Sequence, residues 1–187
     1  MALTISGTSN GKLGNLSLSA NTGDILDSAN TSFFGADQWY LNTNHTTNAD
    51  ITAWTRLTND NGGNIGSAMT VSSGVFTFPT TGVWLMLSTF SISTTVSSDD
   101  DAYVVTNTSS DNFSTTNTNI LLFNRFRVVS GRGFSVSSGS FIFDCTDTSN
   151  DKLKFTASSI SSGNLIEGFV SGNSYRSAVS FIRLGDT

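Results

Sequence analysis

Three consecutive aspartates, Asp99, Asp100 and Asp101, form the most concentrated charge in the sequence. Carboxylate oxygens on loops are ligands that Ca²⁺ prefers, so this cluster is a candidate calcium site. Calcium loops usually alternate their ligands along the chain, however, and three neighbouring side chains point in different directions. The cluster therefore fits a solvated turn between Ile92 and Tyr103 better than a calcium site.

The residues needed for hydrolytic chemistry are sparse. The single histidine, His45, lies in an Asn/Thr-rich segment that we expect to be an exposed loop. A Ser–His–acid triad would have to use this histidine, and the sequence has no Gly-x-Ser-x-Gly elbow. One histidine and one cysteine, Cys145, cannot supply the three or four ligands of a typical zinc site. No motif singles out a carboxylate pair for glycoside hydrolysis. We therefore expect a protein that is not an enzyme and has no cofactor.

The composition also excludes several partners. Charged residues make up 12% of the chain, about half the usual fraction, and the formal net charge is −5. The nine Lys and Arg residues are scattered, which argues against binding to nucleic acid or docking by charge on an anionic membrane. The N-terminus does not resemble a signal peptide, and no apolar stretch approaches the roughly 20 residues of a membrane span. We expect the protein to be made in a cytosol.

The elements available to position any site are short strands. Apolar, β-branched and aromatic residues occur in short runs, which are separated by clusters of Gly, Asn, Asp and Ser. Regular short strands with such turn signals indicate an all-β sandwich or jelly roll of about ten strands. The candidate strands are Gln38–Leu41, Ile51–Leu57, Ala68–Val71, Gly74–Phe78, Val83–Ser93, Ala102–Thr106, Asn119–Arg127, Phe134–Cys145, Lys152–Ser158, Leu165–Val170 and Ala178–Leu184.

The clearest candidate strand is Val83–Ser93, whose alternation places four large apolar residues on one face. These are Trp84, Met86, Phe90 and Ile92. We expect the core to depend on Phe78, Trp84, Phe90 and Phe181. Cys145 ends an apolar run and is expected to be a small buried hydrophobe.

Residues 1–37 differ from the rest of the chain. They are rich in Gly, Ser and Asn and contain too few large apolar residues to form a core. We expect an extended N-terminal arm over 1–37 and a jelly-roll domain over 38–187. The arm would attach by adding a strand to a neighbouring chain, a mode in which alternate side chains give specificity. The inserted side chains would be Leu3, Ile5, Leu16 and Leu18.

The segment Val75–Leu87, which reads VFTFPTTGVWLML, resembles the strand–turn–strand signature of one jelly-roll family. This family includes tumour necrosis factor and the globular head of complement. The matching early, late and closing segments are Ile65–Thr70, a hairpin of Phe141–Cys145 with Lys152–Phe155, and Val179–Gly185. The resemblance covers about residues 38–185 and implies a homotrimer. The chain lacks the collagen-like stalk and signal peptide of secreted members, which argues against a signalling role.

The ends of the chain carry a second resemblance. Met1–Ser9 and Phe181–Thr187 are similar to the ends of fibre-like virion proteins of bacteriophages. This resemblance implies a virion structural protein, either a capsid decoration (cement) trimer or a short fibre. Its partners would be further copies of itself and the major capsid or other virion proteins, and its location the virion.

Two other functions stay open. A receptor-binding adhesin would recognise host surface glycan through exposed aromatic residues, for which Trp39, Tyr40 and Tyr175 are candidates. Aromatic residues in a jelly roll are more often core residues, however. A depolymerase is the least favoured alternative, because the sequence has no acid/base motif for it.

Overall fold

The computed structural model describes residues 35–58, 62–94, 100–115, 119–128, 133–170 and 174–187. Its regular elements are all β-strands, which confirms the all-β prediction. The strands are β1 (Ala36–Leu41), β2 (Trp54–Arg56), β3 (Asn64–Ile65), β4 (Thr70–Ser72), β5 (Val75–Thr77), β6 (Gly82–Thr94), β7 (Asp100–Ser109), β8 (Asn119–Val128), β9 (Phe134–Cys145), β10 (Lys152–Ser158), β11 (Asn164–Ile166), β12 (Phe169–Val170), β13 (Ser174–Tyr175) and β14 (Ala178–Gly185). Among these described residues, no helix is long and apolar enough to cross a membrane.

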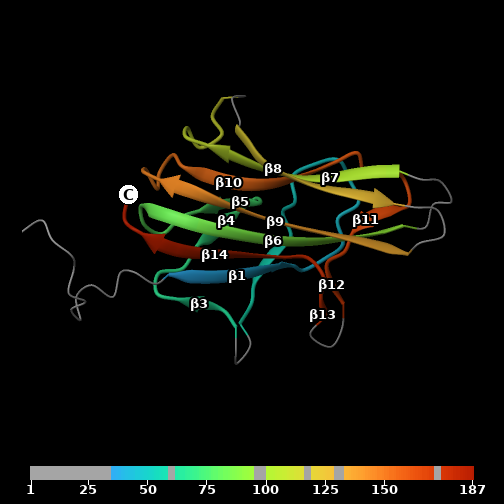
Figure 1. Ribbon diagram of the computed structural model, residues 1–187, viewed down its shortest axis with the longest axis horizontal. Coiled ribbons are helices and arrows are strands. Elements are labelled where there is room, and N and C mark those ends of the chain that lie inside the picture. The colour runs from blue at the N-terminus through green and yellow to red at the C-terminus, as the bar shows by residue number, and fades with distance from the viewer. Residues whose placement is uncertain (1–34, 59–61, 95–99, 116–118, 129–132, 171–173) are drawn as a thin grey trace, which may run out of the picture. The chain divides into compact units, whose positions relative to one another are not determined.

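Two antiparallel sheets form the jelly-roll sandwich (Figure 1). The seven-stranded sheet has the order β11-β6-β14-β1-β2, with β3 paired to β1 and β9 paired to β6. The five-stranded sheet has the order β4-β5-β10-β7-β8. The short strands β12 and β13 pair with each other and project away from the sandwich as a hairpin.

Aromatic side chains from both sheets fill the space between the sheets. Phe76, from the five-stranded sheet, lies at the centre of this core, with its ring 5.6 Å from Trp39, 5.6 Å from Trp54 and 5.2 Å from Phe181. The expected core residues also lie here, each at most 1% exposed: Phe78, Trp84, Phe90 and Phe181. Buried rings in edge-to-face and tilted contact contribute much of the stability of such a sandwich.

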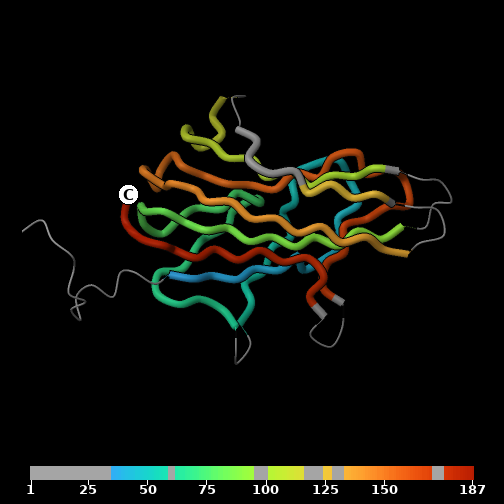
Figure 2. Tube along the Cα trace, in the orientation of Figure 1, coloured from blue at the N-terminus to red at the C-terminus, as the bar shows by residue number. Residues whose placement is uncertain are grey.

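The chain crosses from one sheet to the other where the sequence had suggested a hairpin. β9 pairs with β6, whereas β10 pairs with β5 and β7, so the expected pairing of Phe141–Cys145 with Lys152–Phe155 is wrong. The connection between them is held by Asp151, whose Oδ2 accepts hydrogen bonds from the backbone N–H groups of Thr146 and Asp147. Figure 2 shows the trace passing between the two layers. Strand alternation alone does not reveal which strands pair.

A second crossover explains the glycine in the Pro79–Gly82 turn. β5 ends before this turn in one sheet, and β6 begins at Gly82 in the other. Gly82 has φ 135°, and a Cβ at this position would lie 2.4 Å from the carbonyl oxygen of Gly185. A side chain would therefore clash with the end of β14, so the close approach of the two strands requires glycine.

Several strand boundaries differ from the expected ones. β1 begins at Ala36, so Ala36 and Asp37 belong to the sandwich rather than to the arm. β7 begins at Asp100, so Asp100 and Asp101 belong to a strand, while Asp99 lies outside the described residues. The expected strand Leu165–Val170 is two elements, because its halves pair with different partners. Sequence alternation had not indicated β3 or β13, which have two residues each.

Candidate functional site

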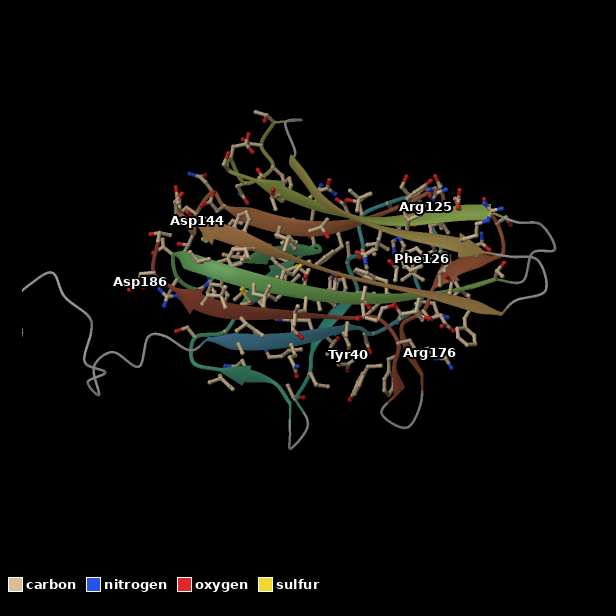
Figure 3. The ribbon with its side chains drawn as sticks, in the orientation of Figure 1. Tyr40, Arg125, Phe126, Asp144, Arg176 and Asp186 are labelled. Atoms are coloured by element: carbon tan, nitrogen blue, oxygen red, sulfur yellow. The ribbon has the colours of Figure 1, made fainter. Side chains whose placement is uncertain are left out.

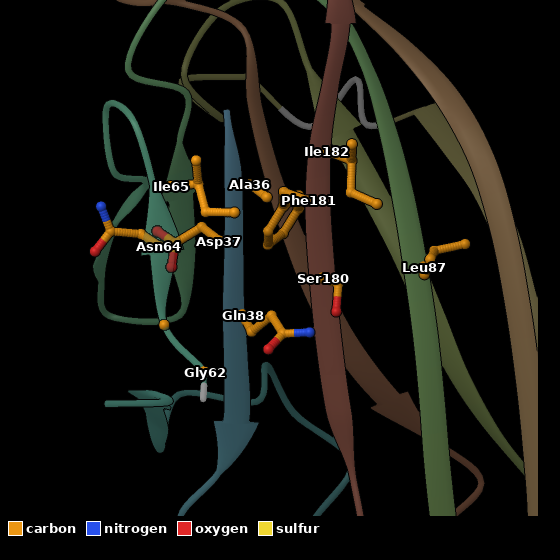
Figure 4. A pocket seen from close by; sticks show the side chains of 11 residues that line it. Ala36, Asp37, Gln38, Gly62, Asn64, Ile65, Leu87, Ser180, Phe181 and Ile182 are labelled. Carbon is orange, nitrogen blue, oxygen red and sulfur yellow. The ribbon is translucent and has the colours of Figure 1, made fainter. Parts of the chain in front are cut away.

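A row of aliphatic side chains crosses the outer face of the seven-stranded sheet. Because successive residues of a strand point to opposite faces, cross-strand partners on one face form a continuous row. The pairing register connects Ile65 to Ala36, Ala36 to Ile182, Ile182 to Leu85 and Leu85 to Ile142. Five strands thus contribute one apolar side chain each, and Figure 4 shows the first three positions side by side. We call these five residues the aliphatic row.

The two ends of the aliphatic row are the most exposed part of it. Ile65 is 65% exposed and Ile142 is 64% exposed, while the residues between them are half-buried. A hollow of about 510 Å³ lies beside the row and is lined by Ile65, Gln38, Leu87 and Ser180, among others. With adjacent strands about 4.8 Å apart, the row extends about 19 Å across the sheet.

Charge is nearly absent from this face. The outward positions of β1, β14, β6 and β9 carry one charged residue, Asp144, which lies next to the aliphatic row on β9 (Figure 3). The remaining outward residues of these strands are aliphatic, aromatic or small and polar. Contiguous exposed apolar surface of this kind marks interaction sites in proteins.

The charged residues Asp37 and Arg56 of the same sheet lie on its inner side instead. Asp37 is 1% exposed and accepts hydrogen bonds from the Arg56 guanidinium at 3.0 Å and from the backbone N–H of Met69 at 2.8 Å. The Arg56 guanidinium also lies over the Trp39 ring, 4.5 Å from its centroid. These contacts bind β1 to β2 and to the segment before β4, so they hold the edge that carries Ile65.

Of the aspartate cluster, the structure describes the side chain of Asp101 alone. Asp99 lies outside the described residues, and Asp100 is the first residue of β7. The Asp101 carboxylate accepts a hydrogen bond from Arg125 at 2.7 Å, which lowers its pKa. Among the described residues, no group of three His, Cys, Asp or Glu side chains is placed to hold a metal ion.

Two other candidate residues for chemistry, His45 and Cys145, are held by hydrogen bonds or buried. The ring of His45 is hydrogen-bonded through Nε2 to the carbonyl of Thr47 at 2.8 Å, and its backbone pairs with Ile166. Cys145 is buried, and this burial raises the pKa of its thiol to about 11. Its thiolate, the reactive form, is therefore scarce at neutral pH. The candidate arm residues Leu3, Ile5, Leu16 and Leu18 lie outside the described residues.

The three candidate aromatic residues separate into two environments. Trp39 is buried in the core, as expected for an aromatic residue of a jelly roll. Tyr40 and Tyr175 instead pack together near the surface, with ring centroids 4.5 Å apart. They are joined by Phe169 of β12, which the sequence had not singled out.

Sequence reasoning missed the aliphatic row, although a signal for it was present. In β6 the outward residue between the core positions Trp84 and Met86 is also aliphatic, namely Leu85. Ile142 and Ile182 repeat this pattern on β9 and β14. A strand that is apolar on both faces indicates a sheet whose second face is also covered. The sequence does not give the pairing that aligns these residues.

Comparisons with known proteins support the fold. No protein-family model and no curated protein sequence matches the chain. Among solved structures, Eiger TNF from S. frugiperda matches with a TM-score of 0.59 and 14% identity, over 82% of this chain and 94% of that one. Murine APRIL matches with a TM-score of 0.53 and 11% identity, over 81% of this chain and 99% of that one. The fold is therefore a jelly roll like that of tumour necrosis factor.

Proposed function

We propose that this protein is a non-enzymatic structural module that assembles into a homotrimer through the outer face of its seven-stranded sheet. The observation that carries this proposal is the aliphatic row, which extends across five strands and has strongly exposed isoleucines at both ends. Burying a side chain such as isoleucine contributes about 1.5–3 kcal/mol. A face with this composition is stabilised when a second copy covers it.

The geometry of the aliphatic row favours a closed ring over a twofold dimer. Its two ends differ: Ile142 lies on β9, while Ile65 lies on β3 beside the hollow of about 510 Å³. A contact between two different patches is heterologous, and repeating such a contact produces a ring when the rotation closes. With Asp144 as the one charged residue on the outward positions of β1, β14, β6 and β9, like charges would not oppose this contact.

We further propose that the trimer is part of a bacteriophage virion, as a capsid decoration protein or a short fibre. The resemblance of the chain ends to fibre-like virion proteins supports this role, as does the low charge of the polar surface. The segment before Gly35 would be the attachment arm, with Leu3, Ile5, Leu16 and Leu18 inserted into a capsid or other virion protein. This segment joins the sandwich at the start of β1, next to Ala36 of the aliphatic row.

Native mass spectrometry of the full chain at micromolar concentration tests the self-association. We expect the wild-type protein to be a trimer and the Ile142→Asp and Leu85→Asp variants to be monomers, because each variant places a charge in the buried interface. The matched control is Ser72→Asp, an exposed residue of the five-stranded sheet, which should stay trimeric. A monomeric wild-type protein, or trimeric Ile142→Asp and Leu85→Asp variants, would contradict the proposed interface.

The role of the arm is tested by a truncated chain that begins at Gly35. We expect it to keep the β-sheet circular dichroism spectrum and the trimer, because the described sandwich begins there. It should fail to bind virions from which the protein has been stripped. A truncated chain that folds and still binds would assign attachment to the sandwich instead.

A further inference from the structure

Three aromatic side chains meet where the β12–β13 hairpin leaves the sandwich. Tyr40 comes from β1, Phe169 from β12 and Tyr175 from β13. The ring centroids of Tyr40 and Tyr175 are 4.5 Å apart, and Phe169 lies 5.9 Å from the first and 5.6 Å from the second. Figure 3 places Tyr40 beside this hairpin. We call the three residues the aromatic cluster.

A buried acid fixes the base of the hairpin that carries two of these rings. Glu167 is the single glutamate of the chain and is 9% exposed. Its Oε2 accepts a hydrogen bond from Ser91 Oγ at 2.6 Å, and its Oε1 accepts one from Arg176 at 2.6 Å. Its backbone N–H donates to the carbonyl of Ser91 at 2.8 Å. These bonds tie both ends of the hairpin to β6.

The adjoining glycine provides a second anchor. The backbone N–H of Gly168 donates to the side-chain oxygen of Asn44 at 2.9 Å. A Cβ at Gly168 would lie 2.5 Å from the carbonyl carbon of Thr43, so any side chain here would push the hairpin away. The aromatic cluster thus rests on an ordered base, and a rigid base reduces the entropy lost when a ligand binds.

A small and almost wholly apolar hollow lies beside the cluster, and residues with polar side chains border it. It has a volume of about 110 Å³ and is lined by Tyr40, Tyr175 and Leu57, with Gln38 and Ser180 at the side shared with the larger hollow. Its described lining carries no charged residue. The hydroxyls of Tyr40 and Tyr175 and the side-chain amide of Gln38 make no hydrogen bond to another described residue.

We propose that the aromatic cluster and this hollow form a binding subsite for one neutral pyranose ring of a glycan. A pyranose has a face of C–H groups that packs on aromatic rings, while its hydroxyls need donors and acceptors at the rim. Phe169 is 37% exposed and would supply ring surface, and the apolar hollow would receive C–H groups of the sugar. Tyr40, Tyr175 and Gln38 border the hollow, so their polar groups would serve the sugar hydroxyls at its rim. Pockets that combine an apolar wall with a few polar groups of this kind are typical of ligand sites.

The charge of the surroundings selects a neutral sugar over an acidic one. Arg176, which follows the cluster in sequence, is paired with Glu167 at 2.6 Å. An acidic sugar would have to compete with this carboxylate for the guanidinium. A sugar that carries only hydroxyls meets no such competition and no unpaired charge in the described lining of the hollow.

Saturation-transfer NMR on the full-length protein, with the methyl pyranosides of glucose, galactose and mannose as probes, tests the proposal. We expect at least one of these sugars to bind and its ring C–H protons to receive the strongest transfer. Phe169→Ala and Tyr175→Ala should each weaken binding by about tenfold, the loss typical of removing one aromatic contact from a binding site. Tyr175→Phe keeps the ring and should lose less affinity than Tyr175→Ala.

The matched control is Phe134→Ala, which removes an aromatic ring that is 71% exposed on β9, outside the cluster. Its sugar binding should equal that of the wild-type protein. Phe169 is itself partly exposed, so its replacement should leave the circular dichroism spectrum unchanged. The proposal is overturned if none of the three sugars binds the wild-type protein. Equal binding by the wild-type, Phe169→Ala and Tyr175→Ala proteins would also overturn it.

Discussion

Among the side chains that the structure describes, the outer faces of the two sheets differ in charge. The outer face of the five-stranded sheet carries Lys154 paired with Asp50 at 2.9 Å and Arg125 paired with Asp101 at 2.7 Å. The outer face of the seven-stranded sheet carries the aliphatic row, and Asp144 is the one charged residue at the outward positions of β1, β14, β6 and β9. Both sheets contribute aromatic side chains to one core, so their inner faces do not show this difference.

This contrast distinguishes the residues that stabilise the fold from those that would form the proposed trimer contact. Charged and polar residues on an outer face are satisfied by water and by each other, which is typical of antiparallel sheets with one solvated side. Aliphatic residues on an outer face contribute little to the stability of a single copy and gain free energy when a partner covers them. In the proposed trimer, the seven-stranded sheet would therefore form the contact and the five-stranded sheet would face the solvent.

The sharpest test of this separation uses two neighbouring residues of β14. Phe181 points into the core and Ile182 points outward. We expect Phe181→Ala to lower the free energy of unfolding by about 3–5 kcal/mol, because it removes a fully buried ring. Ile182→Ala should leave the fold intact and weaken self-association. Urea unfolding at fixed protein concentration and native mass spectrometry measure the two effects, and similar unfolding curves for both variants would contradict the assigned faces.

A smaller loss of stability is expected when the buried ion pair of the seven-stranded sheet, Asp37 with Arg56, is broken. Asp37→Ala leaves the Arg56 guanidinium and the Met69 N–H without their acceptor, which should cost about 2–3 kcal/mol, given that Arg56 is partly exposed. Asp144→Ala, at an exposed position of the same sheet, is the control and should unfold like the wild type. A stable Asp37→Ala protein would show that this edge of the sheet is held by packing alone.

Acid should weaken the five-stranded sheet through Asp50. Burial raises the pKa of this carboxyl, but hydrogen bonds from Thr156 and Lys154 outweigh burial and hold it below the usual 3.8. Because the folded-state pKa is depressed, the stabilisation is present above pH about 4 and is lost as the pH falls through the folded pKa. Asp50→Asn should reduce the fall in melting temperature that acid causes, as measured by thermal melts between neutral pH and pH 2. An unchanged profile would assign the loss to other carboxylates.

The smallest effect on stability is expected from the exposed ion pair between Arg125 and Asp101 of the five-stranded sheet. Arg125→Gln removes the partner of Asp101 on the surface, and exposed ion pairs contribute little because water and salt screen them. We expect no measurable change in melting temperature or in oligomeric mass. A clear fall in either would mean that this face is also covered in the assembled protein.

The amino-acid sequence determined the fold class and the inward-facing residues. Short alternating runs such as the one around Trp84 repeat every second residue, and this period alone assigns side chains to one face of a strand. The late strands Phe134–Cys145 and Lys152–Ser158 have the expected bounds for the same reason.

The tertiary structure decided which strands meet and what lies on the outer faces. The sequence suggested that the strands around Asp147 form a hairpin, but the hydrogen bonds accepted by Asp151 shape a loop that carries the chain into the other sheet. The aliphatic row joins residues as distant as Ala36 and Ile182, and the aromatic cluster joins Tyr40 to Tyr175. The alternation of apolar residues with a period of two indicates which face of its own strand a residue occupies. Long-range backbone pairing, which no local pattern encodes, decides which residues share that face.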